Sequence, residues 1–184
     1  LLEALGRKKP QPALFSKRKS KKILEEQPSR YYNFRGNHFD ESDFHSFIDL
    51  LAISKDRIVF LDVSNCGINA ENSKLFFVSL ANNKNLHHIQ QLHVAGMEMN
   101  NESFDSFDFY IKKISEDSPE LQSLDIGYTK QGLKYYLDSL NNFYEGTSFP
   151  LTTLILAHSV VDQEATDALI NFINKSKTLK CLDM

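Results

Sequence analysis

A repeated phrase constrains the fold of this chain more than any other feature of its sequence. Five leucines recur at spacings of 31, 32, 30 and 28 residues, each inside a similar apolar phrase. We call these leucines the anchors: Leu61, Leu92, Leu124, Leu154 and Leu182. A degenerate sixth copy, YNFRGNHF, has Tyr32 in the anchor position. Repeats of this length indicate stacked units of secondary structure rather than one irregular core.

Each repeat is predicted to contain a short strand followed by a helix. Apolar residues lie three positions before and two positions after each anchor, which is typical of a strand with one buried face. Beyond the strand, apolar residues at three- and four-residue spacing indicate an amphipathic helix. Four such stripes begin at Phe44, Phe104, Leu133 and Ala165. A single unit cannot bury its own apolar face, so neighbouring units must stack.

Between strand and helix, an apolar residue seven positions after the anchor is expected to enter the core. The residues in this position are Ile68, Met99 and Val161, whereas Gln131 interrupts the pattern. The predicted fold is therefore an α/β horseshoe, with parallel strands on the concave face and helices on the convex face.

These units resemble the ribonuclease-inhibitor-like subclass of leucine-rich repeats, which implies a leucine-rich-repeat solenoid. Cys66, in LDVSNCGI, occupies a turn position where that family uses Asn or Cys to satisfy backbone groups. The other copies depart from the pattern, with Asn37, Met97, Thr129 and Ser159 in this position. The resemblance covers residues 30–184 and carries little information on function, because this scaffold serves many tasks.

A narrower resemblance is to repeats of the CARMIL family of actin capping-protein regulators. It rests on SPELQSLDI, on the stretch from PLTTLIL to LKCLDM, and on the basic FSKRKSKK. The resemblance implies a cytoskeletal scaffold near membranes. The capping-protein-binding motif of that family has no counterpart here, so no site residue is carried over.

Two regions are predicted. Residues 30–184 form a leucine-rich-repeat domain of about five repeats, the last of them incomplete. Residues 1–29 are a basic segment or the remnant of a preceding repeat, because LLEALGRKKP reads like the end of a repeat helix. The final LKCLDM falls inside a strand phrase, so we expect the fuller protein to continue in both directions.

Charge is distributed unevenly along the chain. Residues 1–30 carry nine Lys or Arg against three Glu, whereas the remainder carries twelve basic and twenty-one acidic residues. An acidic body argues against specific nucleic-acid binding. The basic run has three interpretations: an anionic-lipid site, a nuclear-localisation patch or a solvated loop. The lipid-binding candidates are Lys17, Arg18, Lys19, Lys21 and Lys22.

Motifs for catalysis are absent from the sequence. Its seven glycines form no phosphate-binding loop, and no nucleophile elbow or metal-ligand spacing is present. We therefore expect no enzyme activity, no cofactor, no metal and no small-molecule substrate. Two widely separated cysteines and the lack of a membrane-spanning run or signal sequence predict a cytoplasmic protein, with membrane association through the basic run as an option.

The concave face is the predicted binding site for a protein partner. Side chains flanking each anchor, and those three and four positions after it, are expected to face solvent there. Asp62, His93 and Asp125 take the same position in three successive repeats, so His93 should lie between the two carboxylates. The function predicted is a non-catalytic scaffold in cytoskeletal or signalling regulation; the alternatives are a direct regulator of a small GTPase and a lipid-tethered actin-regulatory scaffold. The candidate partner-binding residues are Tyr31, Arg35, Phe60, Asp62, His93, Asp125, Tyr128, Ile155, His158 and Asp183.

Overall fold

The computed structural model describes residues 31–55, 57–116, 119–144 and 149–184. The predicted basic region 1–29 and its lipid-binding candidates at 17–22 lie outside the described residues. Where the repeats were predicted, the description is nearly continuous.

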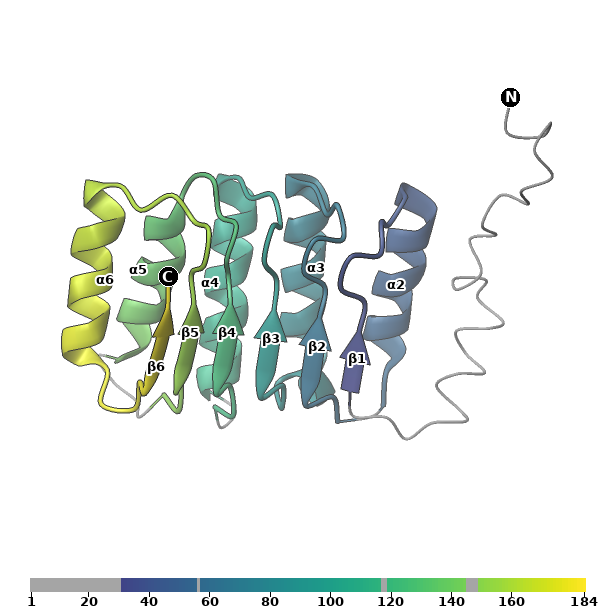
Figure 1. Ribbon diagram of the computed structural model, residues 1–184. Helices are drawn as coiled ribbons and strands as arrows, with labels where there is room; N and C mark the ends of the chain where they lie inside the picture. Colours follow the sequence, from purple (N-terminus) through teal and green to yellow (C-terminus); the bar gives the residue numbers. More distant parts are fainter. Residues whose placement is uncertain (1–30, 56, 117–118, 145–148) are drawn as a thin grey trace, which may run out of the picture.

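The described residues form an α/β fold with a six-stranded parallel sheet and five α-helices (Figure 1). This confirms the predicted α/β class. Neighbouring strands in the sheet are also neighbours in the sequence, and one helix connects each strand to the next, with a short 3-10 helix (η2, Lys84–Leu86) after α3. The strands are β1 (Tyr31–Asn33), β2 (Phe60–Asp62), β3 (Gln91–His93), β4 (Ser123–Asp125), β5 (Thr153–Ile155) and β6 (Cys181–Asp183). The helices are α2 (Glu41–Ile53), α3 (Ala70–Asn82), α4 (Asn101–Glu116), α5 (Leu133–Tyr144) and α6 (Gln163–Lys175).

The register of the sheet places the anchors opposite one another. Tyr32 pairs with Leu61, and the anchors pair in the same way across each of the remaining pairs of neighbouring strands, as far as Leu182. The alignment of the sequence phrases, including the degenerate copy at Tyr32, is therefore the alignment of the strands.

Among the residues that the structure describes, all five α-helices lie on one face of the sheet and none lies on the other (Figure 1). We call this second face the open face. The core lies between sheet and helices: Leu61, Leu92, Leu124 and Leu154 are fully buried there. From the helices come buried aromatic side chains, among them Phe44, Phe77, Phe107, Tyr136 and Phe172.

Short polar side chains fix the start of four helices. Asp40, Asn69, Asn100 and Asp162 each accept a hydrogen bond from the backbone N–H three residues later, which satisfies a donor at the helix start. Because each cap comes eight positions after its anchor, the strand-to-helix distance is the same in these four units.

Two details differ from the sequence expectation. The helix Ala70–Asn82 follows β2 although its apolar stripe was not singled out, because Ser73 takes one of the buried positions and disguises the pattern. Val161, expected in the core, is 37% exposed, whereas Ile68 in the equivalent position is buried. Val160 donates its backbone N–H to Thr129, which orders this turn without burying Val161.

The turn after each strand has a left-handed residue at the same place. The residues four positions after the anchors have φ between 56° and 75°: Gly36, Asn65, Gly96, Tyr128 and His158. Side chains from the next position bind backbone carbonyl groups in this turn. Cys66 Sγ donates to Phe34 O at 3.0 Å and Thr129 Oγ1 to Ile126 O at 2.6 Å. The expected backbone role of Cys66 is confirmed, and it links two neighbouring units.

No helix in the described ranges is long and apolar enough to cross a membrane. The cytoplasmic location predicted from the sequence stays a prediction.

Candidate functional site

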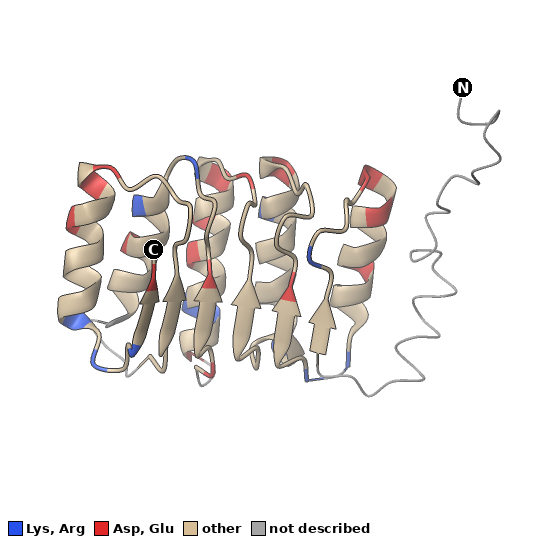
Figure 2. Cartoon of the chain, viewed as in Figure 1, with Lys and Arg blue, Asp and Glu red and all other residues tan. Residues whose placement is uncertain are grey.

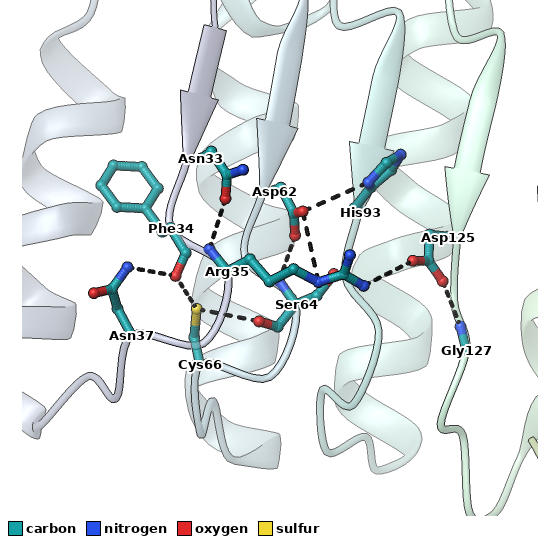
Figure 3. Close-up of polar contacts among 10 residues, drawn as sticks. All are labelled: Asn33, Phe34, Arg35, Asn37, Asp62, Ser64, Cys66, His93, Asp125 and Gly127. Carbon is teal, nitrogen blue, oxygen red and sulfur yellow. Dashed lines mark hydrogen bonds and ion pairs between the residues drawn. The ribbon is translucent and has the colours of Figure 1, made fainter. Parts of the chain in front are cut away.

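Four charged or ionisable side chains from four neighbouring units meet on the open face (Figure 3). We call Arg35, Asp62, His93 and Asp125 the polar cluster. Arg35 Nε lies 3.9 Å from Asp62 Oδ2, and Arg35 Nη2 lies 3.7 Å from Asp125 Oδ2. His93 Nδ1 lies 3.7 Å from the same oxygen of Asp62. The sheet register places His93 between the two carboxylates, as the sequence predicted.

The two carboxylates are fixed by the backbone that follows them. Ser64 N–H donates to Asp62 Oδ1, and Gly127 N–H donates to Asp125 Oδ1, both at 2.9 Å. A side chain on Gly127 would place its Cβ 2.7 Å from Ala157 O, so only glycine fits this approach to the next unit. Each carboxylate therefore keeps one oxygen for the backbone and turns the other toward Arg35.

Burial of these carboxylates corrects the expectation that they face solvent. The Asp62 and Asp125 side chains are only 3% and 7% exposed, whereas the Arg35 side chain above them is 50% exposed. The reason is that Arg35 extends from the turn after β1 across the next two strands and lies over both carboxylates (Figure 3). A buried carboxylate needs such a partner to stay ionised.

The pKa of the Asp62 carboxyl group is shifted from its usual value. Burial raises the pKa of Asp62, but the nearby His93 imidazole and the hydrogen bond from the Ser64 N–H outweigh burial, and the net pKa lies below its usual value. A carboxyl group whose pKa is depressed in the folded state stabilises the fold above its unfolded pKa, and that stabilisation is lost as pH falls through the folded pKa.

Asp62→Asn is expected to lower the free energy of unfolding at pH 7 by roughly 1.5–3 kcal/mol, the usual range for hydrogen bonds to a charged group. The loss should begin to shrink as the pH falls below ~4, the pKa of aspartate in the unfolded chain, and should disappear only below the lowered pKa of folded Asp62. Urea unfolding at pH 7 and pH 3 measures both quantities. Asp105→Asn, on an exposed position of α4, is the matched control and should change little. A deficit that stays constant with pH would contradict the assigned pKa direction.

Aromatic side chains lie on both sides of the polar cluster. Tyr31 and Phe60 have ring centroids 6.3 Å apart, and Phe60 meets the His93 ring edge-to-face at 5.3 Å. On the other side, Tyr128 and His158 have centroids 4.7 Å apart. Tyr128 and His158 both have a left-handed backbone conformation, which costs energy for any residue other than glycine.

The structure therefore brings six of the ten predicted residues into contact and two others into a second pair. Ile155 and Asp183 lie further along the sheet, on β5 and β6, where they are paired in register with each other. The left-handed backbone at Tyr128 and His158 was missed, because only Gly or Asn signals such a position in a sequence.

A second group of polar side chains lies at the opposite ends of the strands. Glu120 accepts hydrogen bonds from Arg57 and Gln90 and lies 3.0 Å from His88 Nδ1. Burial raises the pKa of Glu120, but these partners outweigh it and the net pKa is lowered. His87 is buried, with its Nε2 2.8 Å from Ala81 O. The contacts of Glu120 join three successive units.

One pocket lies away from the open face, next to the starts of α4 and α5. It has a volume of about 600 Å³ and is lined by Met99, Asn101, Phe104, Gln131 and Tyr135, among others. In the parts of the chain that the structure describes, no group of three or more His, Cys, Asp or Glu side chains is placed to hold a metal ion. The polar cluster is taken as the candidate site because it lies on the face of the sheet that no described helix covers.

Comparison with protein families decides the assignment of the chain. A family model described as RiPP precursor modification enzyme MbnB/TglH/ChrH matches residues 15–123, which is more than half of the sequence. The chain belongs to this family. No match to a curated protein reaches significance. The matched range includes three members of the polar cluster, Arg35, Asp62 and His93, and ends at Ser123 on β4.

This membership corrects several sequence-based predictions. The family that matches is neither the ribonuclease-inhibitor-like leucine-rich-repeat family nor CARMIL, and its description names enzymes. The predictions of a non-catalytic scaffold, a GTPase regulator, a lipid-tethered actin scaffold, no enzyme activity and no small-molecule substrate are therefore wrong. The physical reason is that the repeat pattern reports which side chains are buried, and burial says little about chemistry on the exposed face.

Proposed function

We propose that this chain takes part in the modification of a precursor peptide, which it binds on its open face. The family match carries the proposal, because the description of that family names precursor modification. The location rests on the polar cluster and its flanking aromatic residues, since the other face of the sheet is covered by helices.

We further propose that the strand–helix units form a leucine-rich-repeat-type solenoid, with the open face on its concave side. The near-constant unit length and the unbroken register of the anchors support this architecture. A helix occupies more width than a strand, so a stack with all helices on one face curves toward the strands. A peptide bound there would contact the same positions in several units, including the ten predicted residues.

His93 is the group best placed to transfer a proton in this site. Its Nδ1 faces Asp62, so the buried carboxylate is positioned to orient the imidazole, the arrangement that tunes histidine as a general acid or base. The Arg35 guanidinium lies over the same carboxylate and favours its ionised form. Asp62 is then a positioning residue.

Mass spectrometry of co-expressed peptides tests the proposal. The chain is expressed with a genetically encoded library of peptides, and bound peptides are recovered and compared with those from cells without the chain. We expect a subset with a defined mass change. In His93→Gln the modified fraction should fall by about 100-fold or more, in the range of losing a general acid or base, while the same peptides still bind.

Asp105→Asn is the matched control and should modify peptides at the wild-type rate. Recovery of bound peptides without any mass change would contradict the proposed activity. An undiminished mass change in His93→Gln would remove His93 from the reaction while leaving the activity in place.

A further inference from the structure

We propose that the open face recognises basic residues spaced three apart in an extended, polyproline-like stretch of peptide. This inference rests on the proposed function and adds the chemistry of its substrate. It follows from the spacing of three carboxylates, from an arginine that already lies between two of them, and from the aromatic rings beside them.

The carboxylates recur on every second strand. Asp62, Asp125 and Asp183 are the last residues of β2, β4 and β6, and the register aligns them. Neighbouring strands lie ~4.8 Å apart, so successive carboxylate positions are separated by roughly 9.6 Å along the sheet. Figure 2 shows acidic residues at the ends of these three strands. Asp183 presents its carboxylate to solvent, whereas the carboxylates of Asp62 and Asp125 lie beneath Arg35 at the same regular interval.

Only one regular peptide conformation matches this interval with every third side chain on the same side. A polyproline II helix rises ~3.1 Å per residue with three residues per turn, so residues three apart are ~9.3 Å apart and point the same way. In a β-strand, residues three apart point to opposite faces. In an α-helix the matching separation is seven residues, ~10.5 Å, which is longer than the carboxylate interval.

Arg35 shows which chemical group the carboxylates accept. Its guanidinium spans Asp62 and Asp125 at 3.9 and 3.7 Å, longer than hydrogen bonds, and its side chain is half exposed. Such a loosely held cation is open to displacement by an arginine of the peptide. Asp183 is exposed and completes the row at β6.

Aromatic rings on the open face are placed to pack against the peptide residues that lie between its basic residues. Grooves that bind polyproline-type peptides are lined by aromatic side chains. Tyr31 is 67% exposed and Tyr128 47% exposed, and they lie on either side of the polar cluster. The net charge of residues 31–184 is also negative, with twelve basic and twenty-one acidic side chains, which favours the approach of a basic peptide.

Fluorescence anisotropy with synthetic peptides tests the spacing. The probe is a fluorescein-labelled RPPRPPR peptide, and RRRPPPP is the control of identical composition. We expect the spaced peptide to bind about tenfold tighter at low salt. Asp183→Asn should weaken it about threefold, as for an exposed ion pair, whereas Arg35→Gln should strengthen it by removing the internal competitor. Asp105→Asn should leave the affinity unchanged.

Equal affinity for the two peptides would overturn the inference. Tighter binding of an alanine-rich helical peptide with arginines seven apart would overturn it as well. Thermal melting of each variant ensures that a weakened affinity is not caused by unfolding. The proposed function fails separately: it requires a mass change in co-expressed peptides, which these non-reacting probes do not report.

Discussion

Replacement of Leu124 by aspartate is expected to abolish the cooperative unfolding transition of this protein. Leu124 is fully buried, and its strand β4 is paired on both sides, with β3 and β5. An ionised carboxylate in that position has no partner, and the loss of the leucine packing adds to the cost. The combined effect exceeds ~5 kcal/mol, which approaches the whole stability of an ordinary domain. Circular dichroism during heating measures it.

Leu124→Met provides the matched control for this experiment. Methionine keeps nearly the same volume and should cost less than ~1.5 kcal/mol. If Leu124→Asp melted like the wild type, Leu124 would not lie between the sheet and the helices, and the alignment of the anchors would be wrong.

Phe107→Ala is expected to lower the free energy of unfolding by about 3–5 kcal/mol, the range for truncating a buried aromatic residue. Phe107 is fully buried in α4, and its ring centroid lies 5.2 Å from that of Phe77 and 4.8 Å from that of Tyr136. It therefore joins three consecutive helices. Urea denaturation gives the change in free energy.

Phe109→Ala is the matched control on the same helix. Phe109 is 39% exposed, so its truncation should cost much less than that of Phe107. Equal losses for the two variants would contradict the assignment of the buried face of α4.

The strands could be predicted from the sequence almost residue by residue. Each anchor is fixed by apolar neighbours on the same strand face, so a shift of one residue would expose the whole set. The helix Ala70–Asn82 was less visible because Ser73, at a buried position, bonds to the backbone carbonyl groups of Asn69 and Glu98. A polar side chain that is satisfied in this way looks exposed in the sequence.

The sequence predicted which charged residues lie side by side on the sheet, but not how deeply they are buried. Asp62, His93 and Asp125 were placed correctly side by side, because strand register alone decides this. Their burial depends on Arg35, whose side chain extends over them from another unit. The spacing of residues along the sequence does not show where a long side chain extends. Membership of an enzyme family was missed because the prediction of no enzyme activity rested on the absence of known catalytic motifs, and such an absence does not exclude chemistry.

Because the strands follow one another in register, the open face is built from equivalent positions that repeat from unit to unit. Each unit contributes the same few outward positions, and its neighbours are the units before and after it in the chain. His93 and Ile155 occupy the same outward position in two units, and the neighbouring strands keep their register at both. If the open face binds a peptide as proposed, its preferences could therefore change through substitutions in single units.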